Sequence, residues 1–395
     1  MLMVSDMLEV AQGRARAEEV TNRSPSRFQR EPAPIVVWNV CRHCNMSCPH
    51  CYLAAGAAPS PSDLSTADAL RVLDDLSASG VRVVIFSGGE PLLRQDLFTL
   101  LAHAQKLGIS PQLSTNGVLI DAEVAKRLAE HGVKYVGISI DGQPEWNDRY
   151  RGLEGGYHRA LMGLRNARAA GLRTGLRMTL TKANAADFPA MMALARAEVD
   201  RFYVSHLVYA GRGRQMVGDD LSRDETRALL VRLFEETDKL LTEGAPLRVV
   251  AGSNDSSGVL LVHWLQDRYG ADAARTVADI LLKRGGNSAG EKLVCIDHRG
   301  GVHPDQFWRG ASLGQLPEQP FAEVMRHPLR EQLKNRVELL TGRCGSCAWK
   351  GLCRGSHRER ALAVSGDMWG SDPACVLRDE EVASASILGE KQGAA

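Results

Sequence analysis

Six short apolar segments alternate with helical patterns between residues 35 and 205, and this alternation restricts the fold more than any other feature. The predicted strands cover residues 35–40, 81–86, 112–114, 135–140, 176–180 and 202–205. Between them, apolar residues recur every three or four positions, which is typical of amphipathic helices. Strands that alternate with helices form a parallel sheet, and right-handed crossovers curl such a sheet into a barrel. We therefore expect an α/β fold with a partial (β/α)6 barrel of the TIM type.

The rest of the chain divides where the pattern changes. Residues 1–33 are polar without a strong period and predict a flexible N-terminal arm before a barrel at 34–215. Helical patterns predict a connector at 216–290. Residues 291–378 contain a Gly- and Pro-rich stretch followed by clustered cysteines, and they predict a small metal-held domain. The last residues, 379–395, predict a frayed tail.

The charge balance excludes two classes of protein. The chain has 395 residues with 48 Lys and Arg against 47 Asp and Glu, so its net charge is +1. This balance argues against a broadly basic nucleic-acid-binding protein and against an acidic disordered chain. No apolar run reaches the roughly 18 residues that a membrane span needs, and the N-terminus lacks the pattern of a secretory signal. We expect a cytoplasmic protein that binds neither nucleic acid nor membrane.

The cysteines fall into two groups, one after the first predicted strand and one near the C-terminus. They are Cys41, Cys44, Cys48 and Cys51 in the first group, Cys344, Cys347, Cys353 and Cys375 in the second, and Cys295 between them. In a reducing compartment, clustered cysteines more often bind metal than form disulfides. Both groups are therefore candidate metal sites.

The first group contains a C-x3-C-x2-C motif formed by Cys44, Cys48 and Cys51. Three thiolates this close can hold three corners of a [4Fe–4S] cube, which leaves the fourth iron open to a chelating small molecule. The alternative is a zinc site in which Cys41 joins the other three as two C-x2-C pairs. The gap between those pairs is much shorter than a zinc ribbon uses, which disfavours zinc.

This motif, together with the segment Gly88-Gly89-Glu90-Pro91 after the second strand, resembles the radical S-adenosylmethionine (SAM) superfamily. The resemblance implies that the three motif cysteines hold a [4Fe–4S] cluster whose open iron binds SAM. It also implies that reductive cleavage of SAM gives a 5′-deoxyadenosyl radical, which is chemistry that the cofactors supply. Cys41 lies outside the motif and is expected to be a spare thiol near the cluster.

Residues at the ends of the next strands, and one residue inside the fifth strand, are the predicted SAM contacts. They are Gly88, Gly89, Glu90, Asn116, Ser139, Asp141 and Arg177. The glycines would let backbone approach the ligand because they lack Cβ, whereas Glu90 would either assist or cap the next helix. The resemblance favours Asn116 and Ser139, although Asn-Gly and Asp-Gly also favour turns. Arg177 needs a partner inside a sheet, and the carboxylate of SAM is a suitable one.

The C-terminal group supplies the four thiolates that a closed metal site needs. Its spacing resembles the auxiliary-cluster region of SPASM/twitch-type radical SAM proteins, which implies a second, fully ligated [4Fe–4S] cluster. A structural zinc ribbon is the alternative. The family pattern has a further cysteine where this chain has His357, and only Cys295 is present for an upstream site. We therefore expect one auxiliary cluster, with Cys295 as a buried thiol.

The segment 201–214, with 175–180 and 295–305, resembles the NirJ family, the radical SAM enzymes of heme d1 biosynthesis. The resemblance implies an iron tetrapyrrole of the didecarboxysiroheme type, from which two propionate side chains are removed to leave oxo groups. It also implies a low-potential electron donor such as flavodoxin or ferredoxin. An apolar slot rimmed by Arg and His suits such a substrate, although a surface loop with solvated arginines is the alternative. The predicted rim residues are His206, Tyr209, Arg212 and Arg214.

Three other functions stay open. A peptide-modifying radical SAM maturase is one, although only 34 residues precede the first strand and a peptide-recognition domain needs more. A relative that makes heme b by the alternative pathway is hardly separable by sequence. A non-catalytic interaction protein held by metal is the third, and metal content and an absorption spectrum would separate it from an enzyme.

Overall fold

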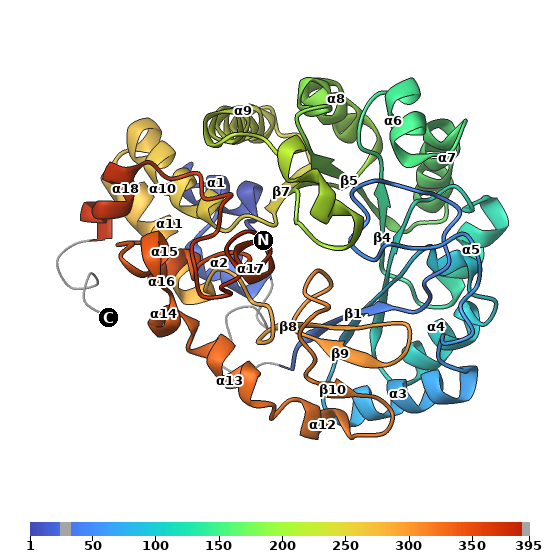
Figure 1. The fold of residues 1–395 in the computed structure, drawn as a ribbon. Coiled ribbons are helices and arrows are strands. Elements are labelled where there is room, and N and C mark those ends of the chain that lie inside the picture. The colour runs from blue at the N-terminus through green and yellow to red at the C-terminus, as the bar shows by residue number, and fades with distance from the viewer. Residues whose placement is uncertain (24–32, 389–395) are drawn as a thin grey trace.

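The computed structural model describes residues 1–23 and 33–388, and its central feature is one ten-stranded sheet (Figure 1). The strand order is β10-β9-β8-β1-β2-β3-β4-β5-β6-β7. The strands are β1 (Ile35–Asn39), β2 (Val83–Ser87), β3 (Ser110–Thr115), β4 (Tyr135–Ser139), β5 (Arg173–Leu180), β6 (Arg201–His206), β7 (Arg248–Gly252), β8 (Leu293–Ile296), β9 (Gly301–His303) and β10 (Gly314–Gln315). All neighbours from β8 through β1 to β7 pair in parallel, and β9 and β10 pair antiparallel.

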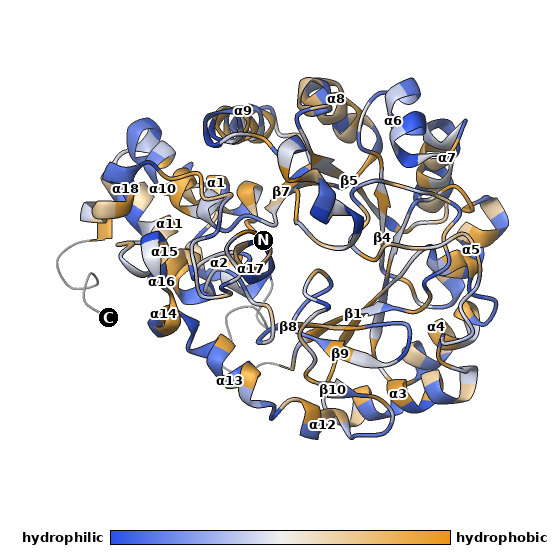
Figure 2. Cartoon of the chain, in the orientation of Figure 1, coloured by the Kyte–Doolittle hydropathy of each residue, from blue (hydrophilic) through white to orange (hydrophobic). Residues whose placement is uncertain are grey.

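Helices cover the outside of this sheet and confirm the predicted partial barrel. They are α3 (Thr66–Ala78), α4 (Leu97–Lys106), α5 (Ala122–Glu130), α6 (Pro144–Arg151), α7 (Gly156–Ala169) and α8 (Phe188–Glu198) (Figure 1). Helix α3 begins after Ser65, whose Oγ accepts a hydrogen bond from the Asp68 amide at 3.1 Å, as its capping pattern predicts. Figure 2 shows apolar residues along the strands and on parts of these helices. Burial of that surface is the main stabilising term for the barrel.

The prediction of a flexible arm at 1–33 is wrong for residues 1–23. Two helices, α1 (Val4–Ala11) and α2 (Ala17–Asn22), occupy this segment. Val4 and Leu8 are fully buried, and the Leu2 amide donates to the Ala251 carbonyl at 2.7 Å. The apolar residues of α1 cover only two turns, too short a window for a helical period to stand out. Residues 24–32 lie outside the described part.

The predicted helical connector at 216–290 also contains a strand. After α9 (Arg223–Thr242), strand β7 pairs with β6 and continues the parallel sheet. The single helix expected at 259–283 is two helices, α10 (Ser256–Tyr269) and α11 (Ala271–Arg284). They meet at Gly270, whose φ of +87° ends the first helix.

The C-terminal part joins the barrel instead of standing apart from it, because β8 pairs in parallel with β1. Beyond β10 the chain forms short helices, namely α12 (Phe321–Val324), α13 (Pro328–Lys334), α14 (Arg336–Leu339), α15 (Gly342–Gly345), α16 (Lys350–Cys353), α17 (Arg358–Ser365) and α18 (Asp379–Ala383). The frayed tail predicted at 379–395 is wrong for 379–388, where the Ser384 carbonyl accepts from the Trp349 indole at 3.0 Å. Residues 389–395 lie outside the described part. Within the described residues, no helix is long and apolar enough to cross a membrane.

Candidate functional site

The cysteine loop follows β1, at the carboxyl end of the parallel strands. In barrels of this type, chemistry takes place at this end. Cys44, Cys48 and Cys51 are partly buried and carry free thiols. Burial raises the pKa of the Cys44 thiol to about 12. A thiolate forms readily at such a site only when a cation replaces the proton, as it does when a thiol ligates a metal.

The three thiols of the motif lie near one another. Besides burial, the Cys48 and Cys51 thiols raise the pKa of the Cys44 thiol, which requires them to be close in space. The loop therefore presents three neighbouring thiols, the donor set that the motif predicts for one metal group.

Gly88 and Gly89 approach the cysteine loop itself. The Gly89 amide donates to the Cys41 carbonyl at 2.8 Å, and the next amide donates to the His43 carbonyl at 2.7 Å. A Cβ at Gly89 would lie 2.1 Å from the His43 carbonyl oxygen, and one at Gly88 would lie 2.6 Å from the Cys41 oxygen. The two glycines therefore let the end of β2 pack directly against the loop backbone and hydrogen-bond to it, a contact that we call the glycine brace.

Glu90 has the capping role that was one of its two predicted alternatives. Its carboxylate is fully buried and accepts from the Thr115 hydroxyl at 2.7 Å, the Asn116 amide at 2.8 Å and the Leu92 amide at 3.1 Å. Burial raises its pKa to about 6 despite these donors. The side chain thus ties the end of β3 to the turn after β2.

Replacement of Gly89 by alanine is expected to reduce iron loading of the loop. The new methyl group has no room beside the His43 carbonyl, and overpacking of this kind costs about 1–3 kcal/mol. We expect total iron after anaerobic reconstitution to fall by about half if the site at the four C-terminal cysteines fills normally. Gly310→Ala is the matched control, because nothing lies within 4 Å of its Cβ position. Equal iron in the two variants would show that the brace is dispensable.

The other predicted SAM contacts lie on neighbouring strands. The Asn116 amide side chain donates to Asn45 of the cysteine loop at 2.7 Å. The β4–β5 register places Ser139 opposite Arg177, and the Arg177 guanidinium donates to the Ser114 hydroxyl at 2.6 Å. Asn116 thus contacts the cysteine loop, whereas Arg177 lies inside β5 and bonds across the sheet to β3.

Asp141 forms an ion pair with a residue that was not among the predicted site residues. Its carboxylate pairs with the Arg151 guanidinium at 2.6 Å and accepts from the Thr179 amide at 2.7 Å. Arg151 is the last residue of α6, a helix that was not predicted. Its segment is mostly polar and offers no apolar stripe, so the sequence carried no signal for it.

Three of the four predicted rim residues have partners within the chain. Tyr209 donates to the Asp220 carboxylate at 2.7 Å. Arg212 donates to the Cys48 carbonyl and to the Ala55 carbonyl, both at 2.8 Å, and therefore supports the cysteine loop. Arg214 pairs with the buried Glu359 carboxylate at 2.8 Å. A substrate carboxylate would have to compete with these partners.

His206 differs from the other three. It ends β6, is buried, and both of its ring nitrogens lack a hydrogen-bond partner in the described chain. Burial, with help from the charge of Arg360, lowers its pKa to about 3. A neutral imidazole with free nitrogens is the form that binds a metal.

The four C-terminal cysteines line one cavity, as their spacing predicts. The walls include Cys344, Cys347, Cys353 and Cys375 together with Arg343, Lys350 and Asp372. Burial raises the pKa of the Cys375 thiol to about 11, so this site also favours thiolates only with a metal present. Cys295 lies elsewhere and is the buried thiol that was expected; its sulfur accepts from the side-chain amide of Asn39 at 3.3 Å.

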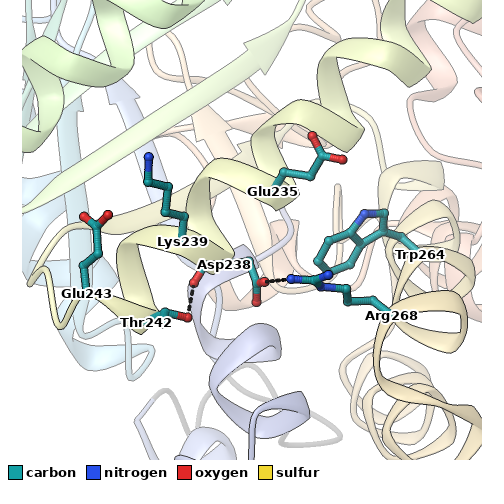
Figure 3. Close-up of a pocket in the computed structure, with 7 residues that line it drawn as sticks. All are labelled: Glu235, Asp238, Lys239, Thr242, Glu243, Trp264 and Arg268. Carbon is teal, nitrogen blue, oxygen red and sulfur yellow. Dashed lines mark hydrogen bonds and ion pairs between the residues drawn. The ribbon is translucent and has the colours of Figure 1, made fainter.

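A separate groove lies between α9 and α10, away from both cysteine groups (Figure 3). It is lined by Glu235, Asp238, Lys239, Thr242, Glu243, Trp264 and Arg268. Asp238 pairs with Arg268 at 3.7 Å, and its carbonyl accepts from the Thr242 hydroxyl at 2.9 Å. The lining of this groove includes none of the cysteines and none of the predicted site residues.

Comparisons with known proteins agree with this geometry. Residues 38–195 match the Radical SAM superfamily model. The chain is 42% identical over 363 residues to Fe-coproporphyrin III synthase of Methanosarcina barkeri (90% of this chain, 91% of the relative). It is 39% identical over 379 residues to pre-heme d1 synthase of Dinoroseobacter shibae (94% and 93%). The fold matches native anSMEcpe with bound AdoMet, with a TM-score of 0.67 at 19% identity over 87% of this chain and 94% of that one.

Proposed function

The chain belongs to the radical SAM superfamily, and we propose that it removes propionate side chains from a didecarboxysiroheme-type iron tetrapyrrole in heme d1 biosynthesis, leaving oxo groups. The observation that carries this proposal is the 39% identity to pre-heme d1 synthase over 94% of the chain. The cysteine loop at the carboxyl end of the barrel supports it, because this is where such an enzyme needs its cofactors.

Radical SAM enzymes use a [4Fe–4S] cluster and SAM, which together supply a 5′-deoxyadenosyl radical for hydrogen abstraction. We assign the cluster to Cys44, Cys48 and Cys51. The glycine brace at the end of β2 and the two bonds from Arg212 hold the loop in place. Ser139, Asn116 and Arg177 remain the proposed contacts of SAM. Asn116 and Ser139 stand at the carboxyl ends of β3 and β4, and Arg177 lies opposite Ser139 inside β5.

We further propose that His206 contacts the substrate iron. Among the histidines that the structure describes, it is the one with both ring nitrogens buried and unpartnered. Tyr209 and Arg214 are proposed to border the same region of the barrel mouth. The C-terminal cysteines are proposed to hold a second [4Fe–4S] cluster, reduced by a donor such as flavodoxin or ferredoxin in the cytoplasm.

A second candidate function is synthesis of Fe-coproporphyrin III. The observation that favours it is the 42% identity to the synthase of that name over 90% of the chain. The two candidates share the radical chemistry and an iron tetrapyrrole, and they differ in the product.

The test is anaerobic incubation of the reconstituted protein with SAM, a reductant and didecarboxysiroheme, followed by mass spectrometry of the pigment. The proposal predicts a product that has lost two propionate groups and gained two oxo groups. A mass equal to that of Fe-coproporphyrin III would favour the second candidate. An unchanged pigment accompanied by uncoupled SAM cleavage would contradict both.

The stability of the protein is expected to fall at acid pH because of His206. Its pKa is about 3 in the folded chain and near 6.5 when exposed, so the unfolded chain binds more protons between these values. This contribution to stability is present above about pH 6.5 and is lost as the pH falls toward 3. Between pH 7 and 5 the wild type should lose about 2 kcal/mol more than His206→Leu.

Urea unfolding of the apo-protein at the two pH values measures this difference. His158→Gln is the matched control, because that histidine is exposed, and it should keep the pH dependence of the wild type. Equal pH dependence of the wild type and His206→Leu would mean that the imidazole is not held neutral by burial.

A further inference from the structure

Helix α6 ends directly on the cysteine loop. The Ser47 amide donates to the Arg151 carbonyl at 3.0 Å. The next residue, Gly152, has a φ of +70°, and a Cβ there would lie 2.1 Å from the Ser47 hydroxyl. The end of the helix and the loop are therefore fixed against each other, and the Arg151 side chain has a defined position beside the loop.

The Arg151 guanidinium reaches a cysteine sulfur. Its Nη1 lies 4.0 Å from Cys48 Sγ, while its Nη2 pairs with Asp141 at 2.6 Å. Arg151 is 5% exposed and Asp141 is 1% exposed. Because arginine does not lose its proton in proteins, a permanent positive charge lies against this sulfur where water does not screen it.

The Asp141 carboxylate also lies beside His50. The His50 Nε2 lies 3.4 Å from the same carboxylate oxygen, and its ring stacks on Tyr150 at 5.0 Å, which stacks on Trp146 at 4.4 Å. Arg212 approaches the Cys48 carbonyl. Arg151 is thus the cation in contact with the sulfur.

We propose that Arg151, oriented by Asp141, donates a hydrogen bond to the Cys48 sulfur and raises the reduction potential of the cluster held by this loop. This inference rests on the proposed cluster at Cys44, Cys48 and Cys51. Reduction adds a negative charge to an iron–sulfur cluster, and positive charge and hydrogen bonds to its sulfurs stabilise that state. Arg151 is a positioning residue in this account, since it acts through the cluster.

The test is a redox titration of the reconstituted protein, followed by electron paramagnetic resonance (EPR) without SAM. The signal that changes when SAM is added afterwards identifies the loop cluster. Arg151→Met should lower the midpoint potential of the loop cluster by about 59 mV. For a one-electron couple, this shift is a tenfold change in the equilibrium constant for reduction. Asp141→Asn should raise the potential, because it leaves the guanidinium charge uncompensated.

Two further variants separate charge from structure. Arg151→Lys keeps the charge without the fork-shaped donor, and its potential should lie between those of the wild type and Arg151→Met. Arg149→Gln removes a charge from an exposed position on the same helix and should leave the potential unchanged because water screens that site. Opposite shifts in Arg151→Met and Asp141→Asn are the signature of electrostatic tuning.

An unchanged potential in a fully loaded Arg151→Met variant would overturn the inference, as would shifts of equal sign in Arg151→Met and Asp141→Asn. A raised KM for SAM at constant potential would instead make Arg151 a SAM ligand. If Arg151→Met loads no iron, Arg151→Lys and Asp141→Asn still decide by their potentials. Absence of a SAM-responsive signal in the wild type would defeat the proposed function itself, and is distinct from these results.

Discussion

Replacement of Cys48 by alanine is expected to abolish formation of 5′-deoxyadenosine from SAM. Cys48 is the central thiol of the loop, and its sulfur lies against both the carbonyl and the guanidinium of Arg151. With two thiols left, the loop cannot hold three corners of a cube. Loss of a residue that only supports a metal ligand costs up to about a hundredfold in activity, so loss of the ligand itself should exceed that. The measurement is 5′-deoxyadenosine per chain after anaerobic incubation with SAM and dithionite.

The same loop provides the control. Cys41 lies before the motif, is buried, and its thiol donates to the Glu90 carbonyl at 3.3 Å. Cys41→Ala should therefore keep the cluster and most of the 5′-deoxyadenosine production. If Cys48→Ala keeps that production while Cys41→Ala loses it, the ligands of the cluster have been assigned incorrectly.

Replacement of Cys347 by alanine is expected to remove the second cluster and stop tetrapyrrole turnover. The cavity between α15, α16 and the segment around Cys375 is lined by four thiols, and one fewer leaves a closed site incomplete. Iron should fall from about eight to about four atoms per chain. The EPR signal that responds to SAM should persist, because the cysteine loop lies on a different part of the fold.

Cys295→Ala is the control for this prediction, since that thiol is buried on β8 and accepts a hydrogen bond from the side-chain amide of Asn39 on β1. It should keep both clusters and full iron content. Two zinc ions per chain in the wild type, or about four irons in both wild type and Cys347→Ala, would contradict the proposed second cluster.

The parallel barrel could be predicted from the sequence because its strands are short apolar runs separated by clear helical periods. All six predicted strands are present and paired in the expected order. Strand β7 (Arg248–Gly252) was missed because it is a short, continuously buried run without alternation, and periodicity alone does not separate such a run from a buried helix segment. Strand β8 was missed because its partner β1 lies more than 250 residues earlier in the chain, and pairing at that separation leaves no local pattern.

In the candidate site, too, local motifs could be predicted from the sequence and contacts between distant residues could not. The two cysteine groups are local motifs, and the structure brings each group together. The roles of Arg151 and Arg212 depend on contacts with the loop across about 100 and 164 residues, which spacing in the sequence does not reveal. Arg212 was selected for its charge and has a structural contact instead. Arg151 was not selected, because nothing distinguishes it locally from the other arginines of this chain.

The most direct test of the central claim is electron–nuclear double resonance on the reduced protein with isotope-labelled SAM. A cube held by Cys44, Cys48 and Cys51 with one open iron predicts that the amino nitrogen and carboxylate of SAM couple magnetically to the cluster. That coupling should persist in Cys347→Ala and vanish in Cys48→Ala. A wild-type cluster that shows no coupling to bound SAM would contradict the account.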